Sequence, residues 1–307
     1  MSLILVILAG AFTSMQTAVN SRLSRALGSN YRSSFTSFGI GAIFLTIFVL
    51  VLSGGQLNFG NFANTTWWYY IGGFTGATAL TLNIILFSHL GSTQTAILPV
   101  VGQLITSALI DQFGWFNMKV INLTLWRIIG LILLLIGACA IVLKPKSKIE
   151  KIETQTKKEE SQLIWQILAV LNGALIAIQT TTNGQLGRAL GSPVKATAIV
   201  FWTGTIILLI ISVIQNQTTK LPKIQRAPWW GYLGGVLGAI NVVLGAWLVT
   251  QLGVGLTTSL QLVGIMAAGL MIDQFGRLGA QKRSIGRLQL IGLAILLIGA
   301  VMVAIFK

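Results

Sequence analysis

The sequence predicts an all-α integral membrane protein with ten transmembrane helices, arranged as two five-helix repeats of inverted topology. Three observations lead to this prediction: the composition, ten apolar segments and an internal repeat. Of the 307 residues, 54% are hydrophobic and 9% are charged. Soluble globular chains carry about 25% charged residues, so the composition places the chain in the membrane class.

Ten apolar segments are long enough to cross a bilayer, which takes roughly 20 residues per helix. The first segment has the position of a signal peptide. The same pattern recurs in the interior of the chain, so we expect a retained helix. The expected helices cover about residues 2–21, 33–53, 67–90, 93–113, 122–143, 163–185, 195–215, 229–252, 254–275 and 288–306.

One long polar stretch, KPKSKIEKIETQTKKEESQ, separates the fifth segment from the sixth. We interpret it as a charged, cytoplasmic linker at residues 144–162 between a first repeat, 1–143, and a second repeat, 163–307. The linker holds four of the six acidic residues of the chain, which are Glu150, Glu153, Glu159 and Glu160.

The internal repeat has an offset of 162–163 residues and covers nearly the whole chain. Residues 16–29, QTAVNSRLSRALGS, resemble residues 179–192, QTTTNGQLGRALGS. A Trp-Trp pair at 67–68 recurs at 229–230, and DQFG occurs at 111–114 and 273–276. Five helices per repeat is an odd number, so the second repeat must enter from the opposite side of the membrane. Inverted repeats are typical of secondary transporters.

The Lys and Arg residues indicate the orientation. Most of them lie in the linker and in the loops that follow the first, seventh and ninth expected helices. These loops should be cytoplasmic, which places both termini outside.

Carboxamide side chains recur at helical spacing inside the expected spans. Such groups are costly against lipid, so they should face the bundle interior or a water-filled cavity. We interpret them as substrate-lining groups, with interhelical hydrogen bonding as the alternative. The candidate substrate-binding residues are Gln16, Asn20, Gln179, Asn183, Asn83, Asn241, Gln103 and Gln261.

Asp111 and Asp273 are the only acids outside the linker. They are the candidate groups for coupling transport to a cation or proton. Because each lies near a helix end, the alternative is an interfacial carboxylate paired with Lys119, Arg127 or Arg277.

Several classes of function are disfavoured. The single His89 and the single Cys139 leave no metal-binding cluster and no internal disulfide, and no cofactor motif is present. No paired catalytic carboxylates exist, so we expect no enzyme. The net charge of +15 lies in short turns without an aromatic-interleaved patch, which argues against nucleic-acid binding.

The order of four motifs resembles the YdcZ-like family of inner-membrane exporters, within the drug/metabolite transporter superfamily. These motifs are Q-x-x-x-N-x-x-L-x-x-x-x-G-S, GG-x-x-G in the third helix, IDQFG, and glycines seven apart in the fifth. The resemblance covers about residues 3–143 and 163–306, as a fused, antiparallel two-unit form. It implies a multi-pass protein of the bacterial plasma (inner) membrane that exports a small organic solute.

Two departures from the relatives bear on mechanism. Multidrug relatives use a glutamate in the first helix for proton exchange, whereas Gln16 and Gln179 cannot titrate. Arg127 precedes Gly130 by three residues, and Gln289 takes this position in the second repeat.

We therefore expect a secondary transporter that works by alternating access, with a small-molecule substrate and the lipid bilayer as its partners. Homo-oligomerisation is left open. The amide-rich lining favours a neutral, zwitterionic or anionic solute over a dication. The alternatives are a passive channel and a non-transporting membrane scaffold.

Overall fold

Helices make up nearly all of the computed structural model, which describes residues 2–56, 65–142, 159–218, 227–278 and 285–306. The first repeat contains α1 (Ser2–Leu27), α2 (Asn30–Leu52), η2 (Trp67–Tyr70), α3 (Ile71–Phe113), η3 (Trp115–Asn117) and α4 (Leu125–Val142). The second contains α6 (Glu159–Ala189), α7 (Pro193–Thr218), η5 (Trp229–Leu233), α8 (Gly234–Leu252), α9 (Val254–Phe275) and α10 (Arg287–Ile305).

The helices have the length and the apolar surface of membrane spans. Seven described helices are long and apolar enough to cross a bilayer, and Ile97–Phe113 and Leu125–Ile141 are shorter apolar helical segments. Large apolar side chains point outward, among them Ile47 on α2 and Ile136 on α4, which are 56% and 49% exposed. Such surfaces are stable against lipid, so the predicted all-α membrane fold is confirmed.

The third and fourth expected spans form one continuous helix, α3. Hydrogen bonding continues through Gly91, where a break was expected. Gly76 contacts the Gln179 side chain, and Gly102 contacts the backbone of Val170, so both arms of α3 pack on α6. A straight helix would put the two glycines about 39 Å apart, whereas the two α6 positions lie about 14 Å apart. The helix therefore bends between its arms, and each arm supplies one span.

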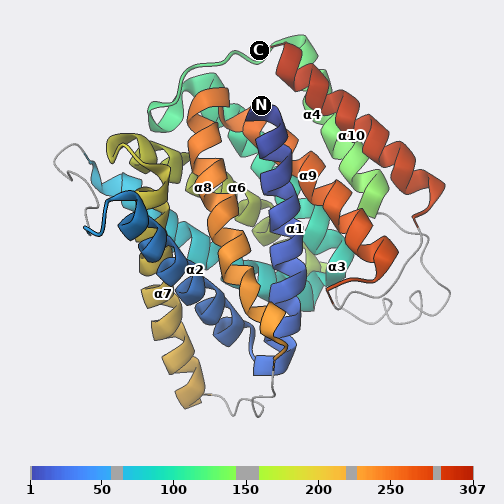
Figure 1. Cartoon of the computed structure of the whole chain (residues 1–307). Coiled ribbons are helices and arrows are strands. Elements are labelled where there is room, and N and C mark those ends of the chain that lie inside the picture. The colour runs from blue at the N-terminus through green and yellow to red at the C-terminus, as the bar shows by residue number, and fades with distance from the viewer. Residues whose placement is uncertain (1, 57–64, 143–158, 219–226, 279–284, 307) are drawn as a thin grey trace.

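Each helix packs mainly on helices of the other repeat (Figure 1). The equivalent helices α2 and α7 pair with each other, with the Phe38 and Phe201 rings stacked at 4.9 Å. The equivalent helices α4 and α10 pair through Gly130 against Gly299 and Gly137 against Gly292. Helix α1 packs on α8 and α9, and α6 packs on α3. This exchange of partners is the arrangement expected of two inverted repeats.

The two copies of the repeated stretch end in the same turn. Gly28 and Gly191 have φ of 65°, a left-handed conformation that ends α1 and α6 without the steric penalty of a Cβ atom. The following serines begin the next helices, since the Oγ atoms of Ser29 and Ser192 accept the N–H groups of Arg32 and Lys195. Residues 144–158 of the predicted linker lie outside the described residues, and residues 159–162 already belong to α6.

Candidate functional site

The repeated carboxamides lie where the two repeats cross. Gln16 and Asn20 on α1 lie against Gly238 and Gly234 on α8, and a Cβ atom at either glycine would collide with the amide. The same contacts occur in the other repeat. Gln179 and Asn183 on α6 lie against Gly76 and Gly72 on α3. Each carboxamide pair therefore packs on a glycine face of the opposite repeat, not on the other pair.

Several of these amides have buried oxygens without a hydrogen-bond partner. The Oδ1 atoms of Asn20, Asn83 and Asn183 are buried, and none has a partner among the described residues. Leaving such an oxygen without a partner costs about 1–3 kcal/mol, so each of the three is a candidate acceptor for a hydrogen bond from water or from a solute.

A second group of candidate amides consists of Asn241 and Gln261, which contact each other. The Gln261 side chain on α9 donates to Asn241 Oδ1 on α8 at 2.8 Å. Gln103 is half-buried on α3, and its backbone carbonyl accepts a hydrogen bond from the Ser107 hydroxyl at 2.6 Å. Gly245 on α8 lies between Gln261 and Thr180 of α6, so the α8 surface connects the two groups of polar side chains.

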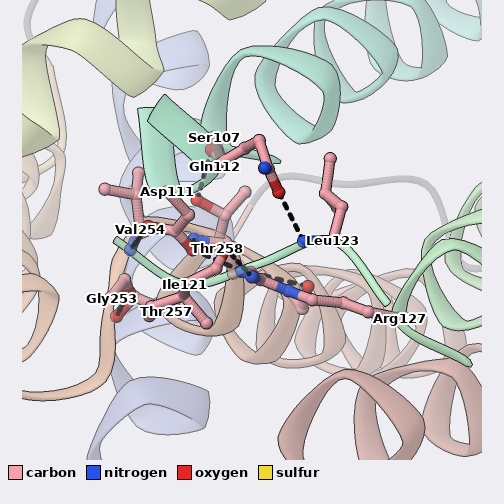
Figure 2. Close-up of polar contacts among 12 residues, drawn as sticks. Ser107, Asp111, Gln112, Ile121, Leu123, Arg127, Gly253, Val254, Thr257 and Thr258 are labelled. Carbon is pink, nitrogen blue, oxygen red and sulfur yellow. Dashed lines mark hydrogen bonds and ion pairs between the residues drawn. The ribbon is translucent and has the colours of Figure 1, made fainter. Parts of the chain in front are cut away.

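Asp111, at the end of α3, binds the start of α9 (Figure 2). Its Oδ1 and Oδ2 atoms accept the backbone N–H groups of Val254 and Gly255, both at 2.8 Å. The carboxylate also forms a salt bridge with Arg127, whose Nη1 donates to the Ile121 carbonyl at 2.9 Å. The ion pair that the sequence offered as an alternative to coupling is thus present. The hydrogen bonds of Asp111 to Val254 and Gly255 join the two repeats, because Asp111 belongs to the first and α9 to the second.

The Gln and the Gly of the DQFG motif have structural roles in both repeats. Gln112 and Gln274 accept backbone N–H groups of the loops that follow, from Leu123 at 2.5 Å and Ile285 at 2.7 Å. The glycines that end the two motifs have left-handed φ values of 64° and 60° and terminate α3 and α9. The motif is therefore a helix end and a loop anchor.

A cavity of about 350 Å³ lies at the Asp273 end of the molecule. Its walls are the α1 residues Ser14, Thr17 and Ser21 and the α9 residues Gly269 and Asp273. Three hydroxyls and one carboxylate line this space together with the apolar residues Ala18, Ile265 and Ile272, and most of the lining surface is apolar.

A second cavity, of about 430 Å³, lies at the opposite end, next to the Asp111 contacts. Ile121 and Gly253 line it, and so do Lys119 and Arg188. The Asp273 and Gly253 ends of α9 are about 30 Å apart along the helix, so the two cavities open at opposite ends of the molecule.

Equivalent positions in the two repeats differ in exposure. Thr17 and Ser21 on α1 are exposed, whereas their counterparts on α6, Thr180 and Gly184, are half-buried and buried. Gly184 is covered by the end of α8, where its Cβ would collide with Val249. At these equivalent positions, α1 is therefore more exposed than α6.

Two residues in this region were not predicted as functional. Arg127 is 1% exposed; the sequence offered it as a partner of an interfacial Asp111 but did not predict its burial. The sequence did distinguish Arg127 by its position: it lies three residues before Gly130, where the second repeat has Gln289 in place of a cation. Asn172 on α6 is fully buried, and neither amide atom has a partner among the described residues. Its helical spacing from Gln179 and Asn183 placed it on their face.

The comparisons with known proteins agree with this architecture. A family model described as "Putative inner membrane exporter, YdcZ" matches residues 1–140 and 164–302. No curated protein matches. A crystal structure of a protein is similar in fold, with a TM-score of 0.74 and 11% identity over 98% of this chain and 96% of that chain. Membrane transport, not catalysis, is the general function that the family description supports. The two matched segments correspond to the two five-helix units, so the chain belongs to the YdcZ family of inner-membrane exporters and is a multi-pass inner-membrane protein.

Proposed function

We propose that the protein is a secondary transporter that exports a small organic solute by alternating access between its inverted repeats. One observation supports this most strongly: equivalent contacts hold the repeats together, yet equivalent positions at the two ends differ in exposure. If the repeats exchanged conformations, the open end would close and the closed end would open.

The backbone at two equivalent glycines supports the same proposal. Gly253 has φ of 91° and separates α8 from α9, whereas its counterpart Gly91 lies within the continuous α3. In the exchanged state, we expect α3 to break at Gly91. The Asp273 carboxylate would then bind the N–H groups that follow, as Asp111 binds Val254 and Gly255.

The carboxamides at the crossings are the proposed solute-binding groups, with Gln16 and Gln179 at equivalent depths. Supporting this, the buried oxygens of Asn20, Asn83 and Asn183 call for donors from a bound molecule. Asp273 remains the candidate coupling group because it lines the more open cavity. Asp111, the other candidate, is engaged in the inter-repeat contact.

Transport into proteoliposomes tests the function. The parent should show counterflow of an accepted solute, because a carrier is accelerated by solute on the opposite side. Gln16→Ala together with Gln179→Ala should lower transport at least tenfold, since both crossings lose a ligand for the solute. The matched control is Gln112→Ala together with Gln274→Ala, which changes the same residue type at equivalent loop anchors.

Three results would contradict parts of the proposal. Transport at the parental rate for every accepted solute in the Gln16/Gln179 variant would remove the binding assignment. Uptake without counterflow would indicate a passive channel. A purified protein that transports no solute, and that none stabilises, would indicate a membrane scaffold.

A further inference from the structure

We propose that the cavity at the Asp111 end is an anion site, which binds the carboxylate or phosphate group of a solute or of a lipid. The inference deepens the proposed function and depends on it only for treating this end as the exit. The cavity, of about 430 Å³, has the size of a small-molecule site.

The polar lining of this cavity is cationic. Lys119 precedes α4 and Arg188 lies in the last turn of α6, and both line the cavity. Around them lie the neutral side chains of Asn122, Thr124, Thr250 and Gln251. The two threonine hydroxyls donate to backbone carbonyls, so the amides of Asn122 and Gln251 are the neutral donors for a ligand. A guanidinium and an ammonium with neutral donors nearby are the groups with which proteins bind carboxylates and phosphates.

The two cations are not neutralised by the described part of the protein. The salt bridge in this region joins Arg127 to Asp111, and the side chains of Lys119 and Arg188 have no ion pair or hydrogen bond among the described residues. Asp111 cannot serve them, because it is fully buried and already holds Arg127 and two backbone N–H groups. A positive cavity therefore remains for an external anion.

A purely structural role for the cations is less consistent with the contacts. Cations often neutralise the C-terminal dipole of a helix, and α8 ends beside the cavity. Such a role would usually include hydrogen bonds to the last carbonyls of α8. Neither Lys119 nor Arg188 makes one with a described residue.

The position of the cavity gives the anion a role in transport. Ile121 and Gly253 line it, and both adjoin the contact between Asp111 and the start of α9. The Ile121 carbonyl accepts a hydrogen bond from Arg127, and Gly253 directly precedes the N–H groups bound by Asp111. A solute passing this contact would meet Lys119 and Arg188 next. The inference narrows the substrate class to solutes with an anionic group, including zwitterions.

The test is binding by the full-length protein in nanodiscs of phosphatidylcholine, a lipid without net charge, titrated with inorganic phosphate and with acetate. We expect binding that weakens with ionic strength, because exposed charges are screened. Lys119→Gln and Arg188→Gln should each weaken it about tenfold, as expected for loss of one charge-assisted hydrogen bond. Arg25→Gln is the matched control, since Arg25 is the counterpart of Arg188 at the other end and should leave binding unchanged.

A second arm identifies the source of the anion. If the anion comes from a lipid, free phosphate should not bind. Native mass spectrometry should then show phosphatidylglycerol retained by the parent and lost from the Lys119→Gln/Arg188→Gln variant. The inference is overturned if neither phosphate, acetate nor phosphatidylglycerol binds, or if the double variant binds them as the parent does. Both side chains are exposed, so the variants should melt at the parental temperature. The assay uses no gradient, so its result is independent of whether transport is observed.

Discussion

At the residue scale, the buried Asp111 carboxylate makes the charged contacts that join α3 to α9. It accepts two backbone N–H groups of α9 and pairs with Arg127, and the two side chains are 0% and 2% exposed. Gln289, the counterpart of Arg127, donates to the carbonyl of Ile141 instead, at 3.3 Å. This equivalent position is therefore a cation, Arg127, in the first repeat and a neutral amide, Gln289, in the second.

Removing one member of this pair should destabilise the protein strongly. Arg127→Gln strands the buried carboxylate, and Asp111→Asn strands the buried guanidinium, so each should cost about 3–5 kcal/mol. The double variant should lose less than the sum, because neither charge is left alone. Thermal unfolding in detergent measures these effects, with exposed Arg188→Gln as a control expected within about 0.5 kcal/mol of the parent. Strictly additive losses would mean that the ion pair is not a unit.

At the element scale, glycines allow the helices of the two repeats to cross closely. A Cβ atom at Gly102 would collide with the carbonyl of Val170, and one at Gly264 would collide with the carbonyl of Ile7. These obstacles are backbone atoms, which cannot move aside as a flexible side chain can. Small residues at crossings are the usual basis of close helix packing in membranes.

We therefore predict that Gly102→Ala and Gly264→Ala each destabilise the protein by about 1–3 kcal/mol through overpacking. Gly39→Ala on α2 is the matched control, because the nearest atom to its Cβ would be 3.8 Å away, at Thr205. It should be neutral or stabilise, given the higher helix propensity of alanine. The midpoint of thermal unfolding is the measurement. Equal losses at all three positions would show that the crossings are not tightly packed.

At the scale of the whole molecule, the sequence predicted the parts that local pattern and symmetry determine. These include the membrane fold and the two inverted units. It could not predict which of two equivalent positions is broken or closed. Leu90-Gly91 and Leu252-Gly253 are the same dipeptide, yet only the second interrupts a helix.

The difference between the ends lies in tertiary contacts, such as those of Asp111 with the start of α9, which local sequence does not determine. The sequence offered Arg127 as a partner of Asp111 but did not predict that the pair is buried, because its burial depends on the packing of the turn after α3 against α9. Which amides face a cavity also depends on helix crossing, so the sequence placed them on faces but not against Gly238 or Gly76.

The unequal ends lead to a prediction for the entire molecule. In a Cys139→Ser background, Thr17→Cys should react with a membrane-impermeant maleimide at least tenfold faster than Thr180→Cys, because Thr17 is exposed and Thr180 half-buried. By the predicted orientation, Thr17→Cys should react in inside-out vesicles. Adding Asp111→Asn should accelerate labelling of Thr180→Cys and slow that of Thr17→Cys, since loss of the Asp111 contact with α9 favours the exchanged state. Because this substitution is also expected to destabilise the protein, labelling is measured well below the unfolding midpoint of the variant. If the added substitution accelerates both, the two ends open independently, and alternating access is contradicted.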